Sequence, residues 1–399
     1  MWFMKQFLIL CVNGALSVVL GMIDTSFGNN MGIDAIIVLA SWTTLYYLFH
    51  KIAMLGDCCY QCDPTKFTEG FIISIIMSGL AGVIVIVTSG PTSSLFEITE
   101  KQQELLIKCT VIYGLGIPIS QIETMFNRHL ILTGKNKELV SATVIFYIAM
   151  ISWDAVCLFL HTECYWLIVG TVICNLFTDV YYVVICKCHK DFNKPDWSCL
   201  KEFLSRGCFM WLERVGNAIA YVLASVMSSY LGEMQYAMHS VCIGIASATE
   251  GVTDCWCQNQ IVKLQDKSVE DKLKIFRVER RRTFLPAVFI SIVLALALFM
   301  PMKGALPVGT TFKYLLLYLS QIIFLCPYEN YRGLLTSLKY TKCMPVNVLV
   351  GSIFRLLYVY ICVVTPIGLY GLAFMVSFVF VLRALMYAVA IKKKYNILI

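Results

Sequence analysis

Asp24 is the residue of this chain whose type and place most strongly suggest chemistry. It ends an apolar run that begins near Phe7, and it is followed by the polar residues Thr25 and Ser26 and a glycine-containing turn. A carboxylate inside a bilayer costs roughly 2.5 to 3.5 kcal/mol on insertion scales, so it usually faces a protein interior or a watery cavity. We therefore interpret Asp24 as functional. The alternative is a carboxylate satisfied by an interhelical hydrogen bond.

A second set of acidic residues lies in apolar runs of the other half of the chain. With aromatic neighbours, such acids can hold a cationic aromatic substrate by charge and cation–π contact. The alternative is that Glu213 and Asp254 lie at the membrane interface and pair with Arg214 or Lys263. Glu329, between Pro327 and Tyr328, is the better candidate. The set comprises the acids Glu213, Glu250, Asp254 and Glu329 with the aromatics Trp42, Tyr328 and Trp256.

No pattern of residues predicts an enzyme, a metal centre or a cofactor. The five histidines are scattered over separate segments, and neither a nucleophile elbow nor a phosphate loop is present. Many of the 18 cysteines lie in apolar runs, and we interpret them as small core residues. The group Cys58, Cys59 and Cys62 matches no zinc spacing, although it could join Cys186, Cys188 and His189.

The elements that must position these residues are membrane helices. A chain that is 59% hydrophobic and 14% charged is typical of a multi-span membrane protein. We predict an all-α membrane protein of about twelve helices, each needing about 20 apolar residues. The predicted helices span residues 6–28, 33–55, 69–89, 105–131, 139–160, 164–186, 207–231, 235–258, 283–302, 312–336, 345–365 and 367–390.

Basic residues gather on one side of this arrangement. They fill the loops after residues 128, 187 and 263 and the tail from Lys392, whereas the other side has only Lys101, Lys303 and Lys313. The positive-inside rule makes the basic side cytoplasmic, with both termini inside and the first run a helix, not a cleaved signal. The basic residues form no tract beside aromatics, so we expect no nucleic-acid partner. The stretch 263–282 predicts a solvated helix that can touch lipid headgroups.

The two halves of the chain repeat local features. Near Gly32 and near Gly232 a helix ends at the glycine, and an alanine, Ala35 or Ala237, opens the next span. Arg128 and Arg332 each lie at the inner end of the fourth helix of their half. We therefore predict a six-helix bundle over residues 1–190, a cytoplasmic linker over 191–206 and a second six-helix bundle over 207–399, related as parallel repeats.

This pattern resembles the multidrug and toxin extrusion (MATE) family. The likeness rests on Ile23-Asp24-Thr25 before the glycine turn and Ala35, and on Glu213-Arg214 opening a helix that reaches Leu231-Gly232 before Ala237. It covers nearly the whole chain. It implies two six-helix bundles around a central cavity, with alternating access driven by sodium ions or protons.

The resemblance also implies a cation-coupling site. Asp24 matches the family's first-helix aspartate, Asp154 its fifth-helix aspartate and Thr171 its sixth-helix threonine. The family often has an asparagine where this chain has Met150, so the coordination is altered or supplied by Asn175. Counting about 1.5 Å per residue puts Asp24 and Asp154 at one depth. Hard oxygen ligands suit Na⁺ and paired carboxylates suit a shared proton, and the sequence leaves both open.

These features predict a cation-coupled antiporter that exports small cationic or amphiphilic compounds. A flippase of the same fold for a lipid-linked or peptide product is the first alternative, and a polytopic receptor is the second. The two-half repeat argues against the receptor, which has no need of two equivalent bundles. We expect a monomer in the cell membrane, the inner membrane where there are two, with membrane lipid and a small-molecule substrate as its partners.

Overall fold

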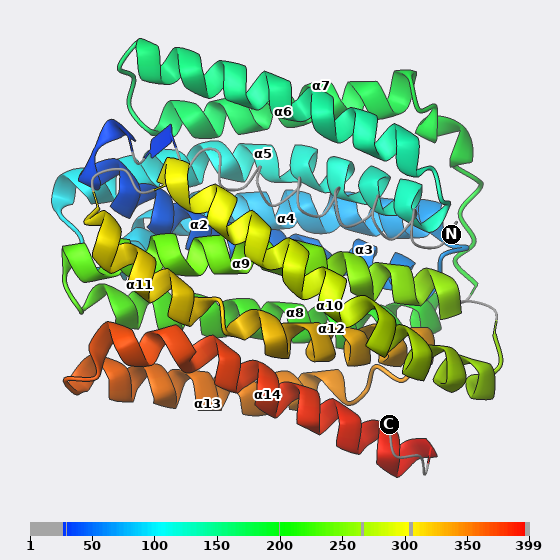
Figure 1. Cartoon of the computed structure of the whole chain (residues 1–399). Coiled ribbons are helices and arrows are strands. Elements are labelled where there is room, and N and C mark those ends of the chain that lie inside the picture. Colours follow the sequence, from blue (N-terminus) through cyan, green and yellow to red (C-terminus); the bar gives the residue numbers. More distant parts are fainter. Residues whose placement is uncertain (1–26, 29, 199, 265–266, 303–305, 396–399) are drawn as a thin grey trace. The chain divides into compact units, whose positions relative to one another are not determined.

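Every regular element in the described part of the chain is a helix (Figure 1). A computed structural model describes residues 27–28, 30–198, 200–264, 267–302 and 306–395. The predicted helix over 6–28 lies almost entirely outside these ranges. The helices are α2 (Ile33–Ala53), α3 (Leu55–Cys62), α4 (Phe67–Ser93), α5 (Glu100–Leu132), α6 (Asn136–Phe159), α7 (Tyr165–Val184), the 3-10 helix η1 (Cys188–Asp191), α8 (Leu200–Ser229), α9 (Glu233–Leu264), α10 (Val269–Met302), α11 (Val308–Tyr318), α12 (Gln321–Ser337), α13 (Met344–Val364) and α14 (Gly368–Tyr395).

The predicted all-α membrane fold is confirmed. Within the described residues, eight segments are long and apolar enough to cross a membrane, with α11 and α12 counted as one span. A ninth is obtained if the two parts of α10, bent by 47°, form a single span. The predicted spans over 207–231 and 235–258 are helical as α8 and α9, although their sequences are more polar.

Three elements differ from the prediction. The short helix α3 follows α2 directly and was not predicted. Helix α10 begins at Val269, because the charged stretch expected to form a separate linking helix runs on into the apolar span. The predicted helix over 312–336 is interrupted between Tyr318 and Gln321, so it forms α11 and α12.

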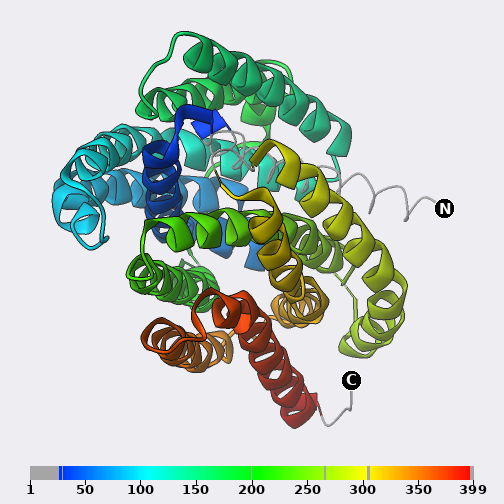
Figure 2. The same ribbon diagram turned by 60° about the vertical axis from the view of Figure 1, so that its left-hand side comes forward.

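The described chain forms two compact units. The first contains α2 to α8 and ends at Ala237, and the second contains α9 from Met238 onward with α10 to α14. Helix α8, the expected start of the second bundle, packs on α2 and α3 within the first unit. In the second unit α13 and α14 form a pair, drawn in orange and red (Figure 2). The superposition of residues 1–186 on 207–390, which parallel repeats predict, stays a prediction.

Glycines let helices of the first unit approach closely. A Cβ on Gly56 of α3 would lie 2.0 Å from the carbonyl oxygen of Gly70 in α4, and one on Gly82 would lie 2.5 Å from that of Gly114 in α5. Small residues at helix contacts are typical of membrane proteins, where van der Waals packing replaces the hydrophobic effect between helices. These contacts fix α3, α4 and α5 in the framework that carries the polar site.

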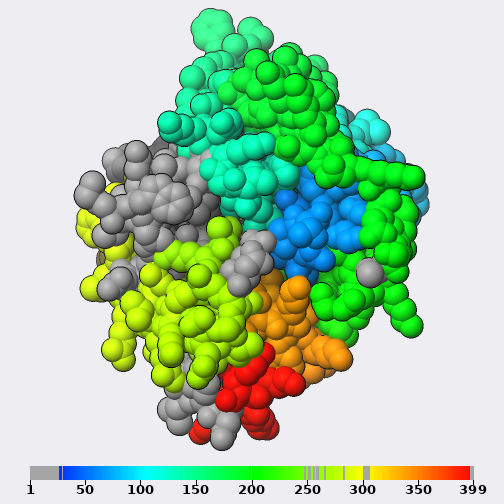
Figure 3. Space-filling model, turned by 90° about the vertical axis from the view of Figure 1, so that its right-hand side faces the viewer, coloured from blue at the N-terminus to red at the C-terminus, as the bar shows by residue number. Residues whose placement is uncertain are grey.

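The segment after α7 lies across the first unit as a strap (residues 188–198). The backbone N–H of Asn193 donates to Thr68 Oγ1 at 3.0 Å, and that of Asp196 donates to Glu69 Oε1 at 2.7 Å. Lys66 forms an ion pair with Asp196 at 2.8 Å. Figure 3 shows this end of the unit, where the strap in green borders the start of α4 in blue. The predicted linker 191–206 is therefore partly ordered, and α8 begins inside it at Leu200.

The two turns that suggested a repeat share their backbone conformation. Gly32 has φ 118° and Gly232 has φ 94°, values that a residue with a side chain rarely adopts. Ala35 and Ala237, which follow them, are both buried. Local structure thus repeats at these two places, in keeping with the repeat seen in the sequence.

Candidate functional site

The predicted coupling residues of α6 and α7 lie at one level. Trp153 packs against Gly170, where a Cβ would lie 2.2 Å from its ring, and Trp153 Nε1 donates to the carbonyl oxygen of Trp166 at 2.8 Å. Asp154 follows Trp153 and Thr171 follows Gly170, so both lie about 8 to 9 Å from the turn that joins the two helices. Asp154 is completely buried, and Asn175 lies one turn beyond Thr171 on the same stripe of α7.

Three predicted site residues cannot be placed. Asp24 lies outside the described residues, and so do the side chains of Glu250 and Trp256, whose backbones belong to α9. The pairing of Asp24 with Asp154 therefore stays a prediction.

Glu329 has a basic partner from its own helix. Arg332 forms ion pairs with Glu329 at 2.8 Å and with Asp254 of α9 at 2.5 Å. The carboxylates of Glu329 and Asp254 also lie near Cys257, close enough to hold a metal ion, but both already pair with Arg332. The pairing of Asp254 with Lys263, considered from the sequence, is not the one formed, since Lys263 pairs with Glu279 at 2.7 Å.

Two of the aromatic candidates, Tyr328 and Trp42, are packed against other side chains. Tyr328 is stacked on Tyr387 with ring centroids 5.6 Å apart, and the guanidinium of Arg383 lies 4.6 Å from the centroid of its ring. Trp42 is buried in the core of the first unit, where Tyr113 meets its ring edge-on at 6.0 Å. Their role in substrate selection stays a prediction.

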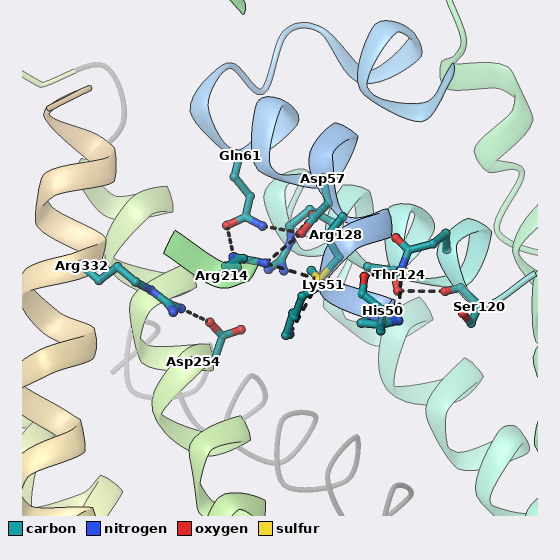
Figure 4. Close-up of polar contacts among 12 residues, drawn as sticks. His50, Lys51, Asp57, Gln61, Ser120, Thr124, Arg128, Arg214, Asp254 and Arg332 are labelled. Atoms are coloured by element: carbon teal, nitrogen blue, oxygen red, sulfur yellow. Dashed lines mark hydrogen bonds and ion pairs between the residues drawn. The ribbon is translucent and has the colours of Figure 1, made fainter. Parts of the chain in front are cut away.

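A buried polar network joins α3, α5 and α8 in the first unit (Figure 4). Asp57 is completely buried and accepts hydrogen bonds from Arg128 Nε at 2.9 Å, Arg214 Nη1 at 3.3 Å and Gln61 Nε2 at 2.7 Å. Gln61 in turn accepts a hydrogen bond from Arg214 Nη2 at 3.1 Å. Arg214 therefore binds Asp57, a partner that the sequence did not suggest. Glu213 beside it is 1% exposed.

The charge state of Asp57 follows from these partners. Helix α3 lies outside the candidate membrane spans. Burial alone would raise the pKa of the Asp57 carboxyl, but the charges of Arg128 and Arg214 outweigh it and hold the pKa below its usual value. The network is thus one carboxylate shared by two guanidiniums, a geometry in which arginine is preferred over lysine.

The Asp57–Arg128 pair has a counterpart in the second unit. Arg128 and Arg332 occupy matching places near the ends of α5 and α12, and each binds an aspartate of an earlier helix, Asp57 or Asp254. The sequence showed the two arginines but not their partners. The only sequence feature that could have indicated these partners is an acid about 70 to 80 positions before each arginine.

Comparison with known proteins found matches among solved structures alone. No family model matches the chain, and no curated protein matches it. An inward-facing multidrug resistance MATE family transporter of the MOP superfamily matches with TM-score 0.71 and 15% identity over 98% of this chain and 99% of that one. The outward-facing form matches with TM-score 0.69 and 15% identity over 99% and 95%.

A third match is a MOP superfamily transporter from Pyrococcus furiosus, described by a reverse polarity of its binding pocket that suggests a different function. Its TM-score is 0.68, with 17% identity over 98% of this chain and 96% of that one. These matches cover nearly all of the chain, and they confirm at the level of the fold the resemblance that the first helices suggested. The chain has the fold of the MATE family transporters of the MOP superfamily.

Proposed function

We propose that the chain is a cation-coupled antiporter that exports small cationic or amphiphilic compounds by alternating access. Its fold is similar to both an inward-facing and an outward-facing MATE transporter. The observation that carries the coupling part of the proposal is Asp154, which has no exposed surface within a candidate membrane span. An acid at such a position normally belongs to an ion or proton pathway.

The proposed coupling site consists of Asp24, Asp154, Thr171 and Asn175. Asp154 and Thr171 come from neighbouring helices at similar height, and Asn175 lies one turn, about 6 Å, farther along α7. Their oxygens suit Na⁺, and a pair of aspartates equally suits a shared proton. We propose a monomer in the cell membrane with both termini in the cytoplasm.

A flux assay in proteoliposomes tests this function. Purified protein is reconstituted, and uptake of organic cations is followed under an imposed Na⁺ gradient, an imposed proton gradient or no gradient. We expect uptake under one of the two gradients and its loss in Asp24→Asn and in Asp154→Asn, with substrate binding retained. The double variant should lose no more than either single variant, because each change already destroys the site. Gradient-driven accumulation by Asp24→Asn would contradict the proposal.

A second candidate function is a flippase or exporter of an anionic lipid-linked or peptide product. The observation that favours it is that two groups expected to attract a cationic substrate already have internal cations, Arg332 beside Glu329 and Arg383 over Tyr328. The Pyrococcus furiosus relative, with its reversed pocket polarity, is a precedent for such a change within the fold. Flux of an anionic lipid-linked substrate in the same vesicles, without flux of organic cations, would favour this candidate.

A further inference from the structure

Asp179 of α7 is a buried acid that the proposed coupling site does not use. It is 6% exposed, and neither of its carboxylate oxygens has a hydrogen-bond partner among the described residues. An ionised carboxylate left in this state would be strongly destabilising, so a ligand is expected at its oxygens.

A hydrogen-bonded pair of side chains places Asp179 beside a second acid. The hydroxyl of Tyr182 donates to Asn127 Oδ1 at 2.7 Å, and Asn127 Nδ2 donates to Glu123 Oε1 at 2.9 Å. Asp179 lies three residues before Tyr182, and Glu123 lies four residues before Asn127. Since α5 and α7 are separated by one antiparallel helix, they run in the same direction, and both acids lie one turn before the bonded pair.

The two carboxyl groups are therefore at one height on neighbouring helices. The rise of an α-helix puts Asp179 about 4.5 Å and Glu123 about 6 Å before the bonded pair. Helices α5 and α7 are in contact, and the two acids lie within electrostatic range of each other.

The surroundings supply few other charges. On α7 Tyr182, one turn later, lies within electrostatic range of Asp179, and it is also near Cys186 and Cys188 of the following segment. Helix α6, which packs on α7, has no ionisable residue except Tyr147 between Glu138 and Asp154. On α5 the basic residues Arg128 and His129 are bound elsewhere, Arg128 to Asp57 and His129 to Tyr60 and Asp191. In the described residues no ion pair joins a basic group to either acid.

We propose that Glu123 and Asp179 form a binding site for one proton, which the two carboxyl groups share. Like charges in a water-poor site disfavour double ionisation, and a shared proton removes the repulsion and gives Asp179 a hydrogen-bond partner. A sodium ion fits less well, because it needs more oxygen ligands than these groups leave free. The Asn127 carbonyl oxygen accepts from Tyr182 and one oxygen of Glu123 accepts from the Asn127 amide, which leaves the two oxygens of Asp179 and one of Glu123.

This site is separate from the proposed coupling site. Thr171, Asn175 and Asp179 follow one another at intervals of four residues, so they form one stripe on α7. Asp179 lies about 12 Å along the helix from Thr171, toward the Val184 end. The inference holds whether or not the chain transports a substrate.

Infrared difference spectroscopy of the purified full chain tests the site directly. The wild type is expected to show the carbonyl band of a protonated carboxyl group at neutral pH, where an acid in water is ionised. Asp179→Asn and Glu123→Gln should each lose this band, because either change removes one of the two groups that hold the proton. Glu138→Gln, an exposed acid on α6, is the matched control and should keep the band.

Three results would overturn the proposal. One is a band that persists in both single variants. Another is a band that disappears when Na⁺ is added at constant pH, which would make this a sodium site. If the two variants do not fold, Tyr182→Phe replaces them, since it keeps both acids and removes the donor to Asn127. It should shift the band, and an unshifted band would refute the assignment. The band should survive in Asp154→Asn, so a failed flux assay and a failed proton site are told apart.

Discussion

Replacing Asp57 by Asn removes the one negative charge that two buried arginines share. The side chain of Asp57 is 0% exposed, and those of Arg128 and Arg214 are 9% and 8% exposed. Because all three groups are withdrawn from water, the attraction between them is hardly screened. Breaking a buried ion pair from one side typically costs about 3 to 5 kcal/mol. We expect a loss of that size in the free energy of unfolding of Asp57→Asn.

Reversible unfolding in mixed detergent micelles, followed by tryptophan fluorescence, measures this loss. The matched control is Asp196→Asn, which removes an ion pair of 2.8 Å whose aspartate side chain is 61% exposed, and only a small change is expected there. The double variant Asp57→Asn/Arg214→Gln should be less destabilised than the sum of its single variants, because it leaves fewer unpaired charges. Equal losses for Asp57→Asn and Asp196→Asn would refute the reasoning.

Three further outcomes follow from the structure. The pKa of Asp57 is lowered in the folded state, so its contribution to the free energy of unfolding is complete above the unfolded pKa of about 4 and is lost as the pH falls through the folded pKa. When the free energy of unfolding is measured against pH, the values for wild type and Asp57→Asn should therefore converge only at acidic pH. Gly56→Ala should lower the melting temperature because its Cβ would lie 2.0 Å from the carbonyl oxygen of Gly70, whereas Gly79→Ala, with no atom within 4 Å, should not; equal melting temperatures would contradict the packing. Arg332→Gln should destabilise the protein more than Glu329→Gln, since it leaves two carboxylates unpaired, and the opposite order in the same unfolding assay would count against the pairing.

The sequence predicted the helices whose apolar runs are long and continuous. Helix α2 was expected over 33–55 and spans Ile33–Ala53, and α13 was expected over 345–365 and spans Met344–Val364. The start of α10 was missed because hydropathy detects only the part of a helix that lies in the membrane. A helix can continue beyond the membrane as a charged segment, as α10 does. The break between α11 and α12 lies in an apolar run with no proline or glycine at the interruption, so no local signal marked it.

The polar network around Asp57 was harder to predict from the sequence, because its members are distant from one another in the chain. Asp57 is separated from Arg128 by 71 positions and from Arg214 by 157, and it lies in a cysteine-rich segment that has no apolar periodicity. Glu329 is buried, and its depth in the membrane stays a prediction. Its neutralisation by Arg332, one turn later on the same helix, was readable from the spacing of three residues but was not inferred.

The strap over residues 188–198 limits how far the start of α8 can move. Asp196 of the strap is held at the start of α4 by Lys66 and by Glu69, and α8 begins at Leu200. Four steps of fully extended chain reach at most about 14 Å. The start of α8 therefore cannot move farther than this from Asp196 while those bonds persist. The segment that joins the predicted halves is bonded to the start of α4 at Asp196. An insertion in this segment would therefore let α8 begin farther away only if it were placed after Asp196.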